Sequence, residues 1–378
     1  RSTDWIVVNN AVSGAGNTGR HLSFITVNDI AFGASVANTN NISISASRTY
    51  YGGGAITSSA GSITITAGTN IEPSGNLSAS GNVSLTATGM VYLNNSDVTS
   101  SAGNISLTGG PVANRGILMR SSAVSAPAGT ITMSGQSTNN QGVLLYEQSS
   151  ISTTSGAIQI SGAGTTSSAS HSVLIQGAST ISSTSGNVSI TGTLASAAAQ
   201  AIAIEGDSVI SSTSGNLQFT GSGGTDWGVW IAAASILSGS GTISLDGGTG
   251  GIATGVSATT NFGATGSATA SGNISVRGDR HWSGSTKVNY KTTGNIVLNS
   301  KSSDYVANPT YNNHTFTGAA SVQIGNISSV RQVTVDADGT IAGPFTVMGQ
   351  YVNFDAGTDI ITNLGAASSG PRNIGILA

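Results

Sequence analysis

The sequence predicts an all-β protein, a right-handed parallel β-helix (β-solenoid) with three short strands per coil of about 20 to 31 residues. Three observations lead to this prediction: a short unit that repeats, its regular spacing, and further apolar residues at fixed offsets from it. The unit is a glycine, often an asparagine, and then apolar, polar and apolar residues. Its clearest copies are Gly81-Asn82-Val83-Ser84-Leu85, Gly103-Asn104-Ile105-Ser106-Leu107, Gly186-Asn187-Val188-Ser189-Ile190, Gly215-Asn216-Leu217-Gln218-Phe219, Gly272-Asn273-Ile274-Ser275-Val276 and Gly294-Asn295-Ile296-Val297-Leu298.

Each unit is expected to be a strand, because apolar and polar residues alternate with period two between turn-forming residues. The asparagine at its start tolerates a left-handed turn, and stacked amides can hydrogen-bond along the coil axis. We therefore expect a structural asparagine ladder, and its members are Asn82, Asn104, Asn187, Asn216, Asn273 and Asn295.

Two more strands complete each coil. An apolar residue stands five positions before the glycine, as Val98 does before Gly103, and a second long strand such as Val91–Leu93 begins twelve or thirteen positions before it. Only the stretch from the Gly-Asn strand to the next coil varies, so insertions are expected at one corner. The usual hand of parallel crossovers favours a right-handed coil.

The organisation expected along the chain is N-terminal coils in 1–55, regular repeats in 56–300 and less regular coils in 301–378. Residues 247–271 are rich in Gly, Ala, Ser and Thr, which indicates an irregular coil or a long loop there. Because the chain starts at Arg1 without a signal sequence, we expect a mature or excised fragment of something longer.

Composition narrows the function. Only 7% of the residues are charged and the net charge is −3, which leaves too few cations for a nucleic-acid partner. There is no cysteine, and no apolar run is long enough for a membrane span. Low charge and abundant Ser, Thr, Asn and Gly fit an exported bacterial protein, for which no cofactor is expected.

The strand unit Gly103-Asn104-Ile105-Ser106-Leu107-Thr108, set in Ser/Thr/Gly-rich coils, resembles the repeats of filamentous-haemagglutinin-like exoproteins of two-partner secretion. The resemblance covers 56–300 well. It implies an extracellular or cell-surface fibre that an outer-membrane transporter exports. Its partners would be a host-cell receptor, a glycan or another bacterial surface. No clear copy of that family's N-terminal secretion domain is present, so the chain is expected to come from the shaft or functional region.

One tripeptide could bind a receptor. Arg277-Gly278-Asp279 is the sequence that integrins recognise, and it follows the expected strand Ile274–Val276, where the chain should turn at the surface. The alternative is an ordinary turn that needs only Gly278.

A catalytic reading finds weaker support. Glu147, Glu205 and Asp207 are expected near one edge two coils apart, about 10 Å from each other, which is wide for a carboxylate pair. The four histidines, including His281 and His314, are far apart in sequence, and no metal cluster or catalytic triad is indicated. We expect no enzymatic activity.

An apolar stripe is expected on the outside of the coils. The outward residues of the second long strand are Tyr92, Leu118, Leu144, Leu174, Ala203 and Trp230. Either the variable inserts fold back and cover this stripe, which we favour, or it is a docking face for another chain or ligand. The leading hypothesis is a non-catalytic adhesin segment. The alternatives are a subunit that self-assembles into an extracellular filament or sheath and, third, a polysaccharide-degrading enzyme.

Overall fold

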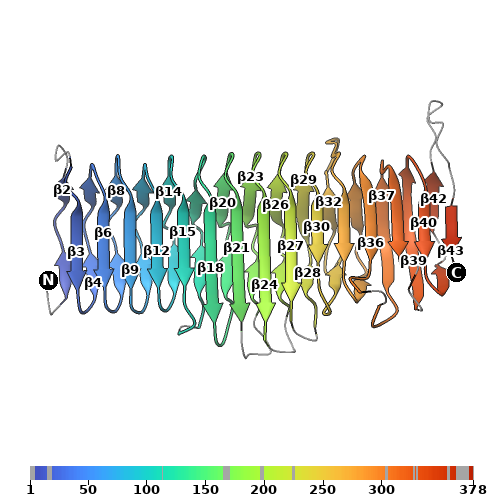
Figure 1. The fold of residues 1–378 in the computed structure, drawn as a ribbon, viewed down its shortest axis with the longest axis horizontal. Coiled ribbons are helices and arrows are strands. Elements are labelled where there is room, and N and C mark those ends of the chain that lie inside the picture. The colour runs from blue at the N-terminus through green and yellow to red at the C-terminus, as the bar shows by residue number, and fades with distance from the viewer. Residues whose placement is uncertain are drawn as a thin grey trace. The chain divides into compact units, whose positions relative to one another are not determined.

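A computed structural model describes residues 5–14, 19–112, 114–164, 171–195, 200–223, 226–302, 305–326, 328, 331–355, 358–362 and 374–377. The chain divides into two compact units, Arg1–Gly186 and Asn187–Ala378. Each unit is a β-solenoid of parallel strands, and the described residues contain no helix (Figure 1). The predicted all-β class and the three strands per coil are thereby confirmed, while the hand of the coil stays a prediction.

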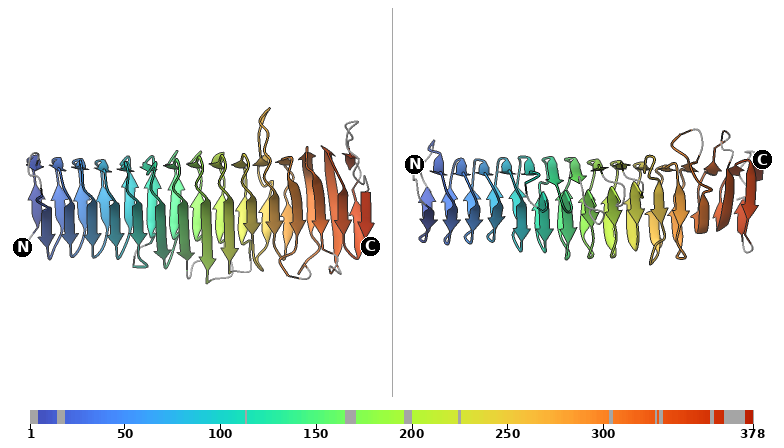
Figure 2. Two further views of the ribbon diagram at one scale, coloured as in Figure 1. Left: turned by 45° about the horizontal axis from the view of Figure 1, so that its top comes forward. Right: turned by 90° about the horizontal axis from the view of Figure 1, so that it is seen from below.

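Unit 1 stacks its strands on three sides, and on each side every strand pairs in parallel with the equivalent strand of the next coil (Figure 2). Side 1 holds the Gly-Asn strands β3 (Leu22–Thr26), β6 (Ile42–Ala46), β9 (Ile63–Ala67), β12 (Val83–Ala87), β15 (Ile105–Gly109), β18 (Ile131–Ser137) and β21 (Ile158–Gly164). Side 2 holds β1 (Ile6–Val8), β4 (Ile30–Phe32), β7 (Tyr50–Gly52), β10 (Ile71–Pro73), β13 (Val91–Asn94), β16 (Ile117–Arg120), β19 (Val143–Tyr146) and β22 (Val173–Ile175). Side 3 holds β2 (Val12–Gly14), β5 (Val36–Asn38), β8 (Ile56–Ser58), β11 (Leu77–Ala79), β14 (Val98–Ser100), β17 (Ala123–Ser125), β20 (Ser150–Thr153) and β23 (Thr180–Ser183).

Unit 2 repeats the three sides. Side 1 holds β24 (Val188–Leu194), β27 (Leu217–Ser222), β30 (Ile243–Asp246), β33 (Ile274–Arg277), β36 (Asn295–Asn299), β38 (Ser321–Gly325), β40 (Phe345–Met348) and β43 (Ile374–Leu377). Side 2 holds β25 (Ile202–Ile204), β28 (Val229–Ile231), β31 (Ile252–Thr254), β34 (His281–Ser283) and β41 (Tyr351–Phe354). Side 3 holds β26 (Ser208–Ser212), β29 (Ala234–Ser238), β32 (Thr260–Gly263), β35 (Val288–Lys291) and β42 (Asp359–Thr362). Two longer strands, β37 (Thr310–Thr317) and β39 (Gln332–Ile341), run through sides 2 and 3.

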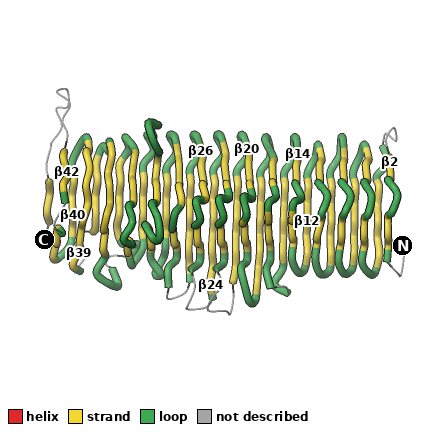
Figure 3. The backbone as a smooth tube through the Cα atoms, turned by 180° about the vertical axis from the view of Figure 1, so that it is seen from behind, coloured by secondary structure: helices red, strands yellow, loops and turns green. Residues whose placement is uncertain are grey.

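The core of each unit is the stack of inward side chains. In β12, Val83 and Leu85 are buried, whereas Thr86 faces solvent, because successive side chains of a strand point to opposite faces. Register keeps equivalent residues on top of one another, with coils as short as 20 residues at Leu22 and Ile42 and as long as 31 at Ile243 and Ile274. Loops join the strands throughout (Figure 3).

Residues 247–271, for which an irregular coil or a long loop was expected, lie in the coil of 31 residues between Ile243 and Ile274, and most of them are in turns and loops. They contain β31 and β32, which keep register with β28 and β29. Ile252 and Phe262 fill inward positions of these two strands, and the small residues make up much of the turns and loops around them. The less regular part begins near 310, where a bulge lies between Tyr311 and His314 of β37. The boundary between the compact units, at 186 and 187, coincides with none of the expected segment limits.

The asparagine ladder is built differently from the expected one. None of its six residues has a positive φ, so the left-handed turn conformation is not used. Each rung instead runs from a side chain to the next backbone: the Asn104 N–H donates to Asn82 Oδ1 at 2.8 Å, and the Asn216 N–H donates to Asn187 Oδ1 at 2.8 Å. The Asn295 N–H likewise donates to Asn273 Oδ1 at 2.8 Å. The amide supplies the acceptor that the strand ladder lacks at the corner.

Replacing Asn187 with Val is expected to lower the free energy of unfolding by about 1 kcal/mol, because the Asn216 N–H loses its acceptor at an exposed corner. Ser189→Val, two residues along the same strand and outward, is the matched control and should change stability by less than about 0.5 kcal/mol. Urea unfolding of both variants measures the difference, and equal losses would contradict the assigned register.

Candidate functional site

The tripeptide Arg277-Gly278-Asp279 is not presented for binding. Arg277 is exposed, but Asp279 is only 5% exposed, and its Oδ1 accepts hydrogen bonds from the Ser302 N–H at 2.7 Å and the Ser302 hydroxyl at 2.8 Å. The carboxyl group therefore fixes the segment after β36 instead of facing a partner. The candidate receptor-binding role of this tripeptide is thus corrected to a structural turn, because its acidic side chain points into the protein.

We expect Asp279→Ala to lower the free energy of unfolding by about 2 kcal/mol, because it removes two hydrogen bonds to the oxygen of a buried carboxyl group. Arg277→Ala should change it by less than about 0.5 kcal/mol, since that side chain is exposed. Thermal or urea unfolding of the two variants tests this. Similar losses at both positions would contradict the structural role of Asp279.

The apolar stripe is mostly buried. Leu118, Leu144 and Leu174 stack in register on the outer face of β16, β19 and β22, yet they are only 5 to 6% exposed, and Ala203 of β25 is 1% exposed. These four residues are not an open docking face, which corrects that reading of the stripe. The burial is the result expected if the inserts fold back over the outer face.

The inserts of unit 1 are themselves packed against the coil. Ser137, the last residue of β18, and Gln141, in the segment that follows it, are buried. The Ser137 hydroxyl donates to the Asn114 carbonyl at 2.6 Å, and Arg115 Nε donates to Gln141 Oε1 at 2.9 Å, so the insert of one coil is bonded to that of the previous coil. At the variable corner of unit 1, the inserts that follow β15 and β18 are therefore hydrogen-bonded to each other.

The two aromatic members of the stripe stay partly open, and each belongs to a cluster. Tyr92 in unit 1 lies near Arg120, which contacts Tyr146 with the guanidinium 5.7 Å from the ring centroid. Arg120 Nε also donates to Glu147 Oε2 at 2.6 Å, and this hydrogen bond is the main cause of the raised pKa of Arg120. Glu147, considered above as half of a catalytic pair, is instead tied to an arginine.

Trp230 in unit 2 belongs to what we call the tryptophan cluster, Trp227, Trp230 and Trp282. The ring centroid of Trp282 lies 6.1 Å from that of Trp227 and 6.3 Å from that of Trp230, with both pairs of planes 26° apart. Trp282 is 39% exposed, and the other two are half-buried. Three of the four tryptophans of the chain therefore meet on one outer surface.

Register explains how these rings meet. Trp230 of β28 and Trp282 of β34 are two coils apart, with Ala253 of β31 between them. Strands two apart are separated by about 9.6 Å, but Ala253 is too small to fill the outer face, so the indoles can lean over it to 6.3 Å. The contact between Trp230 and Trp282 could have been predicted from the sequence, because both stand at the same strand position. The place of Trp227 could not, because it lies in the corner before β28.

Two glycines, Gly250 and Gly251, occupy the corner beside the cluster and carry no side chain. A Cβ on Gly250 would lie 2.6 Å from the Asp226 carbonyl oxygen, and Gly251 has φ +88°, so larger residues do not fit there. The Asp226 carboxyl group accepts a hydrogen bond from the Gln200 amide at 2.8 Å. The Asp226 carboxylate therefore stands next to Trp227 in the chain, and the Gln200 amide reaches it from the neighbouring insert.

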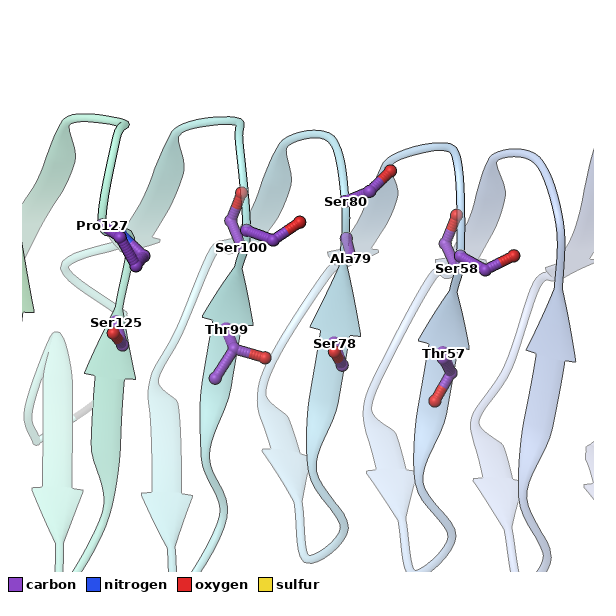
Figure 4. A pocket seen from close by; sticks show the side chains of 11 residues that line it. Thr57, Ser58, Ser78, Ala79, Ser80, Thr99, Ser100, Ser125 and Pro127 are labelled. Atoms are coloured by element: carbon purple, nitrogen blue, oxygen red, sulfur yellow. The ribbon is translucent and has the colours of Figure 1, made fainter.

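A second polar surface lies on side 3 of unit 1. A shallow groove of about 360 Å³ is lined by hydroxyl groups, and Thr57, Ser78 and Thr99 occupy equivalent positions of successive coils (Figure 4). Ser58 and Ser100, also on its wall, donate to the carbonyls of Asn40 and Gly81 at 2.8 and 2.7 Å. The groove offers hydrogen-bonding groups but neither a charge nor an aromatic ring.

The interior of unit 2 brings two histidines together, contrary to their wide separation in sequence. His281 stacks on Tyr311 with 4.2 Å between centroids, and its ring lies 6.0 Å from that of His314. Both are buried, and no ring nitrogen of either has a protein hydrogen-bond partner among the described residues. Burial lowers the pKa of His314 to about 3, and burial together with the charge of His314 lowers that of His281 well below its usual value.

Within the described ranges, no group of three or more His, Cys, Asp or Glu side chains converges in a way that could hold a metal ion. Glu205 and Asp207 belong to unit 2, and Asp207 lines a shallow pocket with Ala233 and Asn261.

No helix long and apolar enough to cross a membrane occurs among the described residues. In comparisons with known proteins, no family model, no curated protein and no solved structure matches the chain.

Proposed function

We propose that the chain is a non-catalytic β-helical segment of an exported bacterial surface adhesin, displayed outside the cell, that attaches to host cells, to other surfaces or to other bacteria. The observation that carries the proposal is a stack of three partly exposed tryptophans on a solenoid whose exposed outward residues are otherwise mainly Ser, Thr and Asn. Aromatic side chains that cluster at a partly exposed position are typical of binding surfaces. The Gly-Asn repeat, through its resemblance to secreted adhesins, supports the same function.

The test is an attachment assay with the purified chain coupled to fluorescent beads. We expect these beads to be retained under flow on at least one of three surfaces, an epithelial cell monolayer, a mucin layer or a lawn of bacteria, above the retention of albumin-coated beads. Retention equal to that of albumin on all three surfaces would refute the proposal.

The filament alternative is decided in parallel. Sedimentation of the soluble chain should show a monomer at high concentration, because the leucines that would drive association are buried. Growth of long assemblies that disappear on dilution would favour a self-assembling subunit instead.

A further inference from the structure

We propose that the tryptophan cluster is a saccharide-binding platform that takes a neutral pyranose oligosaccharide. This inference rests on the proposed adhesive function and names the ligand class of its binding surface. It is carried by the geometry of Trp227, Trp230 and Trp282, by the low corner beside them and by the polar pair Gln200 and Asp226.

The rings are arranged as a supported surface. Trp282 is the most exposed of the three, and two half-buried indoles hold it at centroid distances of 6.1 and 6.3 Å. Its orientation is therefore fixed before any ligand arrives, and little side-chain entropy is lost on binding. The C–H groups on one face of a pyranose ring carry partial positive charge, which complements the negative face of an indole.

The surroundings also suit a sugar. Because Gly250 and Gly251 bring no side chains to the corner and Ala253 brings only a methyl group, nothing from these positions rises beside the rings. A flat ring can then lie across them. The Asp226 carboxyl group and the Gln200 amide offer acceptors and a donor for the equatorial hydroxyls of that ring, and their 2.8 Å hydrogen bond holds them in place.

A neutral sugar fits better than a charged one or a protein partner. Arg280, whose Cβ borders Gly251, brings a positive charge to the same corner as the Asp226 carboxylate, so the corner has no net charge that would favour an acidic or a basic ligand. A protein interface of standard size needs about 800 Å² on each partner. The apolar stripe that could have extended the cluster is closed at Ala203, which is 1% exposed, so the open apolar surface here is small.

The experiment is a titration of the whole chain with three probes, the β-1,4-linked hexaoses of glucose, N-acetylglucosamine and mannose, each to about 5 mM. Intrinsic fluorescence reports directly on the site, because three of the four tryptophans of the chain are in the cluster. We expect a saturable change with at least one probe and a matching heat by calorimetry. No change with any of the three would overturn the proposal.

Variants locate the binding. Trp282→Ala should weaken binding by at least about tenfold, and Asp226→Ala by about threefold. Because Trp282→Ala also removes packing against two indoles, binding is measured well below the melting temperature of each variant. Trp5→Ala is the matched control, since Trp5 is the remaining tryptophan, is 55% exposed and lies outside the cluster. If Trp282→Ala binds as tightly as the parent, the platform is wrong.

The bead assay separates this inference from the function beneath it. Beads coated with Trp282→Ala should lose attachment to the surface that the parent binds. If they still attach while the saccharide no longer binds, the platform binds sugar but is not the attachment surface, and its adhesive role is overturned while the adhesin proposal stands. If the parent beads do not attach but the titration is positive, the adhesin proposal fails and the saccharide site remains.

Discussion

Acidification from about pH 7.5 to about pH 4.5 is expected to lower the free energy of unfolding by about 3 kcal/mol through His314, and His281 adds a further loss of the same sign. Both are buried inside unit 2, where the inward positions of neighbouring coils hold Ile252 and Val288. The groups that face them are the rings of Tyr290, Tyr311 and Phe316, with no carboxylate among these ring contacts to balance a positive charge.

The sign follows from the folded-state pKa values. In the unfolded chain a histidine has a pKa of about 6.5, whereas burial lowers that of His314 to about 3 in the folded state. The unfolded state therefore binds more protons below about pH 6.5, and the stability present above that pH is lost progressively as the pH falls toward about 3. At about pH 4.5 the loss from His314 is about 3 kcal/mol, and His281, with a pKa lowered for the same reason, adds a loss of the same sign.

Urea unfolding at the two pH values tests this expectation in the full chain and in the double variant His281→Phe, His314→Phe. Carboxylates also respond to acid, but they are unchanged in the variant, so the difference between the two proteins isolates the histidines. His21→Phe is the control for the same substitution at an exposed position. An acid loss in the double variant as large as in the parent would show that the buried pair does not cause it.

Most strands could be predicted from the sequence. The Gly-Asn units predicted side 1, and Val98, five residues before Gly103, correctly marked β14. Both follow from local alternation and from a repeat length that the register enforces. Composition marked residues 247–271 as irregular but could not show that β31 and β32 within them pair in register with β28 and β29, because backbone pairing does not depend on side-chain volume.

The candidate site could not be predicted because it depends on contacts between residues that are far apart in the sequence. The hydrogen bonds of Asp279 go to Ser302, 23 residues away, and no local pattern announces them. His281 and His314 face each other from inward positions of sides 2 and 3, in a region where a bulge in β37 lies between Tyr311 and His314, and no local pattern predicts this. The stripe was placed in the correct register, as Leu118, Leu144 and Leu174 show, but its burial depends on how inserts of irregular sequence fold, which periodicity does not describe.

That burial leads to a large effect at the centre of the stripe. Leu144→Asp is expected to lower the free energy of unfolding by about 4 kcal/mol, because Leu144 is 5% exposed and packs between Leu118 and Leu174. About 2 to 3 kcal/mol comes from apolar burial that is lost, and the remainder from placing a carboxylate where little water reaches it.

Gln159→Asp is the matched control, since Gln159 lies in the same coil, on the outer face of β21, and is exposed; it should change stability by less than about 0.5 kcal/mol. Leu144→Met, which preserves volume and apolarity, should lose less than about 1.5 kcal/mol. Melting temperature and sedimentation of all three variants separate the two interpretations of the stripe. A Leu144→Asp protein that melts like the parent but loses oligomers or a partner would mean that this face docks another molecule, because only an accessible leucine can be charged without cost to the fold.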